Sequence, residues 1–133
     1  MTTEVHYFPC SGQGKSATDA IGTLQSLYRT TKWLVEDEPW GLTILPGSGI
    51  NPGNVGSILD SLLPLGLQEV HLSGASWVDG GMLHRREGMG MGVGGEGEWG
   101  VFRTEEKKVR EVREIVDARW DAYVCKVEDS NDN

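Results

Sequence analysis

One order of segments recurs along this chain and restricts its fold more than any other feature: a short apolar run, a glycine-rich turn, then an amphipathic stretch. The clearest copy begins with LTIL (42–45), continues through PGSG, and reaches an apolar face with helical spacing over 55–62. Short aliphatic runs favour buried strands, and apolar residues three or four positions apart favour helices. Asn51 and Pro52 are residue types that begin helices. This stretch therefore predicts a strand, a tight loop and a helix.

Further copies of the same order flank the first one. VHYF (5–8) predicts a strand, and the helical spacing after it predicts a helix over 17–30. QEVHLS (68–73) predicts a third strand, because its apolar and polar residues alternate. Thr104 is expected to cap a last helix that runs over 105–120.

Strands that alternate with helices usually pair in parallel, so we expect an α/β fold of three to four parallel β/α units. A closed eight-stranded α/β barrel usually needs about 250 residues, whereas this chain has 133. The chain is expected to form one domain over residues 1–120, followed by an acidic C-terminal tail over 121–133.

The charge and the cysteine content exclude several classes of protein. A net charge of −8 argues against binding to nucleic acid or to an anionic membrane surface. No apolar run approaches the ~20 residues of a membrane span, and the N-terminal sequence lacks the pattern of a signal peptide. A cytoplasmic location is therefore expected, with Cys10 and Cys125 as free thiols.

The segment SGQGKSA (11–17) resembles a phosphate-binding loop, because glycines precede Lys15 and Ser16. Such a loop needs a glycine five positions before the second glycine, where the backbone curls around the phosphates. Pro9 occupies that position, and proline has a fixed φ and no N–H. The pattern therefore argues against nucleotide binding at this loop.

The loops after the second and third predicted strands end in small residues, which leaves room for backbone N–H groups to converge on an anion. A structural alternative is that these glycines only make tight turns. The candidate anion-binding residues are Gly47, Ser48, Gly49, Ser73, Gly74 and Ala75.

Three further residues are expected to line the mouth of the predicted barrel: His71, Glu69 and Ser11. His71 is a candidate acid/base group or metal ligand, since the unperturbed imidazole pKa lies near neutrality. The alternative is a hydrogen-bonded lining residue without chemistry.

The glycine-rich segment 74–103 breaks the repeated order and is expected to form a long loop. Thioether, imidazole and thiol groups suit Cu(I), a soft ion. Methionines in loops also cover apolar surface without binding metal. The candidate copper ligands are Cys10, Met82, His84, Met89 and Met91.

Four segments, SGQGKSA, ILPGSGINPGNV, EVHLSGA and FRTEEKKVREV, together resemble the C-terminal half of the CutC copper homeostasis family. The resemblance covers roughly residues 5–118 and implies part of a TIM-type (β/α)8 barrel in a cytosolic protein linked to copper tolerance and Cu(I) binding. It places Gly47, Ser48, Gly49, His71 and Ser73 at the C-terminal mouth of that barrel. The N-terminal half of the family, with the cysteines proposed to hold copper, has no counterpart in this sequence.

The resemblance leads to three hypotheses. The first is a truncated copper homeostasis protein without enzymatic activity that binds or carries Cu(I). The second is an enzyme or sensor that holds a small phosphorylated ligand, with His71 as an acid/base group. The third is an association module without its own activity. Because half a barrel leaves strand edges and an inner face uncovered, we expect homo-oligomerisation.

Overall fold

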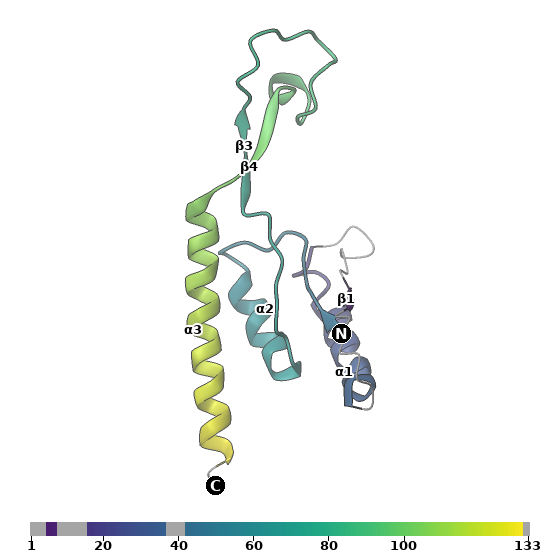
Figure 1. The fold of residues 1–133 in the computed structure, drawn as a ribbon, viewed down its shortest axis with the longest axis vertical. Coiled ribbons are helices and arrows are strands. Elements are labelled where there is room, and N and C mark those ends of the chain that lie inside the picture. Colours follow the sequence, from purple (N-terminus) through teal and green to yellow (C-terminus); the bar gives the residue numbers. More distant parts are fainter. Residues whose placement is uncertain (1–4, 8–15, 37–41, 132–133) are drawn as a thin grey trace.

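The computed structural model describes residues 5–7, 16–36 and 42–131 (Figure 1). The elements follow in the order β1 (Val5–Tyr7), α1 (Ile21–Glu36), β2 (Leu42–Ile44), α2 (Val55–Leu62), the short 3₁₀ helix η1 (Leu63–Leu65), β3 (Ala75–Asp79), a second 3₁₀ helix η2 (Gly95–Gly97), β4 (Gly100–Thr104) and α3 (Glu106–Asn131).

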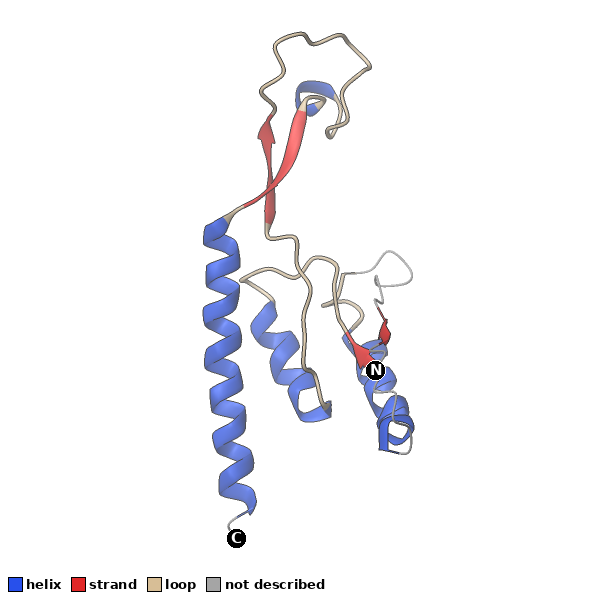
Figure 2. Cartoon of the chain, viewed as in Figure 1, coloured by secondary structure: helices blue, strands red, loops and turns tan. Residues whose placement is uncertain are grey.

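The molecule has a helical body at one end and a projecting β-hairpin at the other (Figures 1 and 2). In the body, α2 lies between α1 and α3 and contacts both. The hairpin consists of β3 and β4 and extends beyond the first turn of α3. We refer to residues 75–104 as the arm.

The core of the body is built around α2. Its four apolar residues at helical spacing, Val55, Ile58, Leu59 and Leu62, are buried. Residues from the neighbouring helices and loops close around them, because a short helix with apolar residues on one face is stable only when that face is covered. The other buried hydrophobic residues are Ala17, Leu24, Tyr28, Ile44, Ile50, Leu63, Leu67 and Val112.

The expectation of a partial TIM-type barrel with three to four parallel β/α units is wrong. Among the described residues, the only parallel pairing joins β1 to β2 over three residues, in the register Val5↔Leu42. The other sheet, β3 with β4, is antiparallel. The predicted third strand over 68–73 belongs to neither sheet.

Proline explains why residues 68–73 do not join β2 as a strand. The backbone N–H of His71 donates to the carbonyl of Pro46 at 2.8 Å, so the two segments lie side by side at this point. In that register the next bond of a parallel ladder would run from the N–H of residue 46 to the carbonyl of Glu69. Proline has no N–H. On the other side, Ser48 has φ 75°, which turns the chain away from the strand direction.

The predicted long loop over 74–103 contains the arm instead. Trp77 faces Phe102 and Val78 faces Val101 across the two strands. Aromatic and β-branched pairs of this kind stabilise antiparallel hairpins. The many glycines between the strands concealed this alternation, because a glycine-rich segment of thirty residues lacks the period of regular structure.

The helix at 55–62 is confirmed with those bounds, and the helix predicted over 17–30 is confirmed with shifted bounds, Ile21–Glu36. Ser16 Oγ accepts the N–H of Asp19, as in a capping box, but α1 begins later, at Ile21. Asn51 Oδ1 accepts the N–H of Gly53 in a turn that precedes α2. Both capping residues therefore stabilise the turn before the helix.

The last helix starts two residues after Thr104, whose hydroxyl donates to the carbonyl of Ser73 instead of capping α3. This bond ties β4 to the segment that leads into β3. Helix α3 continues through the predicted acidic tail to Asn131. Exposed i,i+4 ion pairs, such as Arg113 with Asp117 at 2.8 Å, form along the helix.

Candidate anion pocket and methionine–histidine loop

A pocket of about 220 Å³ lies where the arm leaves the body, and we call it the neck pocket. Its lining contains Gly49, Ser73, Gly74 and Ala75, four of the six residues predicted to bind an anion. The structure thus brings the loop after β2 and the segment before β3 together, although no third parallel strand forms. The remaining lining residues are Ile50, Asn51, Pro52, Leu72, Phe102 and Lys108.

The first wall of the neck pocket is a tight turn held by side-chain amides. Ser48 and Gly49 both have positive φ, 75° and 74°, a conformation that glycine adopts easily. The Nδ2 groups of Asn51 and Asn54 donate to the carbonyl of Gly49 at 2.9 and 2.8 Å. The N–H of Ala17 donates to the carbonyl of Ser48 at 2.9 Å, which attaches this turn to the segment before α1.

The second wall is anchored to the start of α3. The N–H of Glu105 donates to the carbonyl of Gly74 at 2.9 Å. Gly74 has φ 56°, and a Cβ atom there would lie 2.9 Å from Val109 Cγ2. Glycine is therefore needed where the chain bends from the body into the arm.

Lys108 supplies the only cationic side chain among the residues that line the neck pocket. Its ammonium group donates to the carbonyl of Ala75 at 3.2 Å and to the hydroxyl of Ser76, and lies 3.1 Å from the carboxylate of Glu105. Hydrogen bonds from Ser76 and from Lys108 lower the pKa of the Glu105 carboxyl. The pocket therefore holds the ammonium group of Lys108 beside the carboxylate of Glu105. An incoming anion has to displace this carboxylate from the ammonium group.

The sequence did not point to Lys108, because it lies in a charged run typical of a helix exterior. It is 33 residues from Ala75 along the chain, and only the antiparallel return of the arm brings the two together. The one available signal was that Lys108 lies in the first turn of the helix that follows the glycine-rich segment.

Two residues predicted for the barrel mouth lie outside the neck pocket. The imidazole of His71 lies against Gly47, where a Cβ atom would be 3.5 Å from His71 Cδ2. Glu69 lines a different groove beside α2 and α3, and its charge adds to the effect of burial in raising the pKa of Tyr28. Ser11 falls outside the described residues.

The methionine–histidine loop, residues 82–91, lies in the link between β3 and β4. The side chains of Met82, Met89 and Met91 are 57%, 64% and 96% exposed, and His84 is exposed as well. The first part of the loop is fixed by Arg85, which donates to the carboxylate of Asp79 at 2.8 Å. This pairing lowers the pKa of the Asp79 carboxyl.

Three thioethers and one imidazole on one exposed loop fit the chemistry of Cu(I) better than that of harder ions. The described part of the chain contains no group of three or more His, Cys, Asp and Glu side chains that could hold a metal ion. The loop would therefore have to fold around the ion. Cys10, the fifth candidate ligand, lies outside the described residues.

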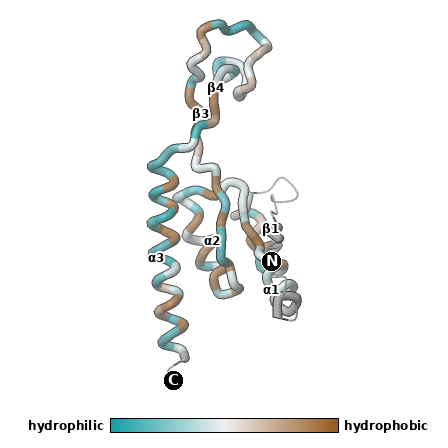
Figure 3. The backbone as a smooth tube through the Cα atoms, in the orientation of Figure 1, coloured by the Kyte–Doolittle hydropathy of each residue, from teal (hydrophilic) through white to brown (hydrophobic). Residues whose placement is uncertain are grey.

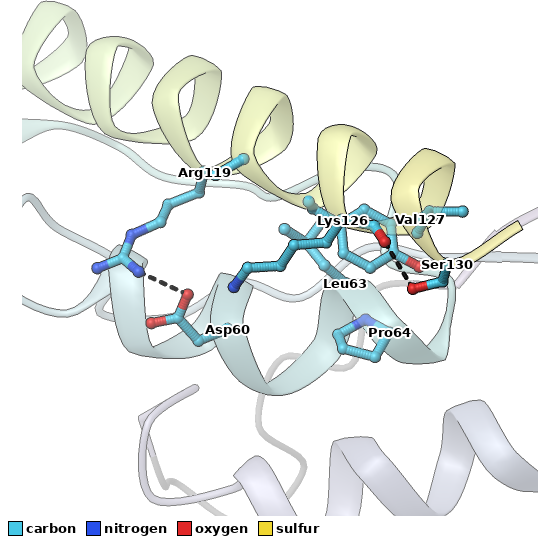
Figure 4. A pocket seen from close by; sticks show the side chains of 9 residues that line it. Asp60, Leu63, Pro64, Arg119, Lys126, Val127 and Ser130 are labelled. Carbon is cyan, nitrogen blue, oxygen red and sulfur yellow. Dashed lines mark hydrogen bonds and ion pairs between the residues drawn. The ribbon is translucent and has the colours of Figure 1, made fainter. Parts of the chain in front are cut away.

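A further pocket of about 370 Å³ lies between the end of α2 and the C-terminal half of α3 (Figure 4). Arg119 reaches across it and donates to Asp60 at 2.8 Å, while Leu63 and Pro64 form an apolar side. None of the residues selected from the sequence lines this pocket. Its paired charges and open shape make it a helix–helix groove with one exposed ion pair.

Comparison with known proteins supports the predicted family. No family model matches the chain. A protein of Chromobacterium violaceum described as "family protein CutC" is 34% identical to this chain over 107 residues. The matched region is 80% of this chain and 39% of that relative, so the chain spans well under half of the relative's length.

The predicted resemblance to the CutC family is therefore confirmed over four-fifths of the chain. Among the described residues, no helix has both the length and the apolar character that crossing a membrane requires.

Proposed function

We propose that this chain takes part in copper homeostasis as a CutC-type protein and binds Cu(I) through its methionine–histidine loop. The similarity to CutC supports the link to copper. The observation that carries the molecular proposal is that Met82, His84, Met89 and Met91 share one exposed loop at the far end of the arm. We also place the protein in the cytosol, which fractionation of cells expressing it would test.

The physical argument rests on ligand type and access. Cu(I) is soft and binds thioether and imidazole groups, whereas Mg²⁺ and Ca²⁺ prefer oxygen ligands. Exposed thioethers can receive the ion from another carrier without prior opening of a core. Because an open loop loses conformational entropy when it closes around an ion, we expect moderate affinity and fast exchange.

The proposal is tested by competition for Cu(I) with a chromophoric chelator under reducing conditions. Replacing Met82, Met89 and Met91 together by Leu keeps the apolar volume and removes the three thioethers. We expect at least about tenfold weaker binding, which is about 1.4 kcal/mol. Leu83→Ala, which changes the same loop without removing a ligand, is the matched control. Equal affinity of the triple variant and the wild type would refute this site.

A second candidate function is binding of a small phosphate-bearing ligand, and the neck pocket favours it. Four of the six residues predicted for this role line one pocket with Lys108. Backbone N–H groups of small residues and one ammonium group are a common way to hold a phosphate. Since His71 lies outside the pocket, this candidate is a binding role and includes no acid/base step.

Phosphate should then raise the melting temperature, because a ligand that binds only the folded state stabilises it. At ten times its Kd the expected gain is about 1.4 kcal/mol. Lys108→Met should remove most of the gain. Lys107→Met is the control, because the ammonium group of Lys107 pairs with Glu111 at 3.7 Å and lies outside the pocket lining. The same gain in both variants would show a general salt effect and count against the site.

A further inference from the structure

The arm exposes apolar side chains on both of its faces. Alternation along the strands places Trp77 and Phe102 on one face and Val78 and Val101 on the other. All four are exposed, from 40% for Val78 to 52% for Val101. A two-stranded hairpin is rarely stable in water when neither face is covered. We therefore expect a protein surface to cover at least one face of the arm.

The face of the arm with Val78 and Val101, which we call the valine face, also carries the positive charge of Arg103. Arg103 lies on the same side of β4 as Val101, two residues further along the strand. Within the described part of the chain, no carboxylate forms an ion pair with Arg103. This face therefore presents two apolar side chains next to one positive charge.

A complementary surface lies along the flank of α3. We call it the flank groove, an open pocket of about 270 Å³. Its apolar lining comes from α2, α3 and the segment after η1: Leu59, Leu63, Leu67, Val70, Val116 and Trp120.

Charges border this groove. Asp117 and Glu69 line it together with Arg113, and Asp121 lies one turn further along the same side of α3. In the described residues, Asp121 has no ion-pair partner. Because Asp117 pairs with Arg113 at 2.8 Å, Asp121 is the carboxylate at this edge that can face Arg103 of the arm.

The arm and the flank groove lie apart along the long axis of the molecule. The arm is at one end (Figures 1 and 3), whereas the α3 residues that line the groove, from Arg113 to Trp120, lie in the middle of the helix. An arm therefore reaches a flank groove only on another molecule. When two copies lie antiparallel, each arm meets the groove of the other, and a two-fold axis relates the two contacts.

We propose that two copies of this chain form an antiparallel two-fold dimer in which the valine face of each arm fills the flank groove of the other copy. Arg103 lies beside Asp121 of the second copy, and Val78 and Val101 cover the apolar lining. Each five-residue strand extends about 17 Å, enough to cover the part of α3 from Arg113 to Asp121, which extends about 12 Å.

To form this dimer, the two chains have to bury enough interface area and overcome the repulsion between their net negative charges. A stable interface buries at least about 1,200 Å² in total. With two arms and two grooves, each of the four surfaces has to bury about 300 Å². Because each chain carries −8, two copies repel one another at long range. Local pairs of opposite charge then decide the orientation of approach.

The test is light scattering coupled to size-exclusion chromatography on the full chain, over loading concentrations from about 1 to 100 µM. The wild type should be a dimer at the upper end. Arg103→Glu and Asp121→Lys should each raise the dimer Kd at least about tenfold, and the double variant should recover to within about threefold of wild type.

The controls change the net charge equally at other places. Arg86→Glu changes a residue in the link between β3 and β4. Asp129→Lys changes a residue on another side of α3 from the groove. Both should shift the dimer Kd by less than about twofold. A monomer at every concentration would overturn the proposal. So would a dimer or larger species that Arg103→Glu and Asp121→Lys leave unchanged.

Discussion

A buried hydrogen bond between α1 and β2 offers the sharpest test of the packing of the body. The hydroxyl of Tyr28 donates to the carbonyl of Ile44 at 2.8 Å, and the Tyr28 side chain is only 6% exposed. Tyr28→Phe removes the hydroxyl and keeps the ring, so no large cavity forms. A buried carbonyl that loses a donor costs between about 1 and 2 kcal/mol. For a chain of this length, that lowers the melting temperature by about 4 to 7 °C.

The same residue predicts a dependence on pH. Burial, with a smaller effect from the charge of Glu69, raises the pKa of Tyr28 above its usual value. A raised pKa in the folded state means that the tyrosine's contribution is fully present below about pH 10 and is lost as the pH rises above it. The phenylalanine variant has no group to ionise there. The difference in stability between wild type and variant should therefore shrink above about pH 10.

Urea unfolding followed by circular dichroism at pH 7 and at about pH 10.5 measures both effects. Tyr123→Phe is the matched control, because Tyr123 is partly buried in the same body and its hydroxyl makes no hydrogen bond among the described residues. It should change the free energy of unfolding by less than about 0.5 kcal/mol. Equal stability of wild type and Tyr28→Phe at pH 7 would refute the reasoning.

Three further substitutions test other parts of the body. Ile58→Ala empties a fully buried position on α2 and should lower the free energy of unfolding by about 3 kcal/mol in urea titrations. Gly74→Ala puts a Cβ near Val109 at positive φ, and should cost about 1 to 2 kcal/mol by the same measurement. Arg119→Ala breaks an exposed pair with Asp60 and should cost under about 1 kcal/mol, decreasing with added salt. A loss above 3 kcal/mol for Arg119→Ala would contradict the exposed environment of that pair.

Local spacing predicted the parts of the fold that depend on nearest neighbours. The helix at 55–62 followed from its apolar residues three and four positions apart, and all of them are buried. The loops at Gly49 and Ser73 were selected for their small residues, and the neck pocket contains both. Such features depend on residues that lie close together in the sequence, so they can be predicted before any tertiary contact is known.

Long-range pairing could not be predicted in the same way. The segment 68–73 has the alternation of a strand, yet its neighbour contains Pro46, which cannot donate to the ladder. The arm was hidden by glycines, and its register depends on two strands separated by a twenty-residue link. Lys108 reaches the neck pocket only because that arm returns to the body. Each of these results depends on contacts between residues that are far apart in the sequence.

The central claim is that the methionine–histidine loop binds Cu(I), and X-ray absorption at the copper edge tests it most directly. The wild type loaded with Cu(I) should show sulfur and nitrogen neighbours around the metal. The triple methionine-to-leucine variant, in a background with Cys10→Ser and Cys125→Ser, should lose the sulfur neighbours that the same background retains when the methionines are present. An identical copper environment with and without Met82, Met89 and Met91 would contradict the account.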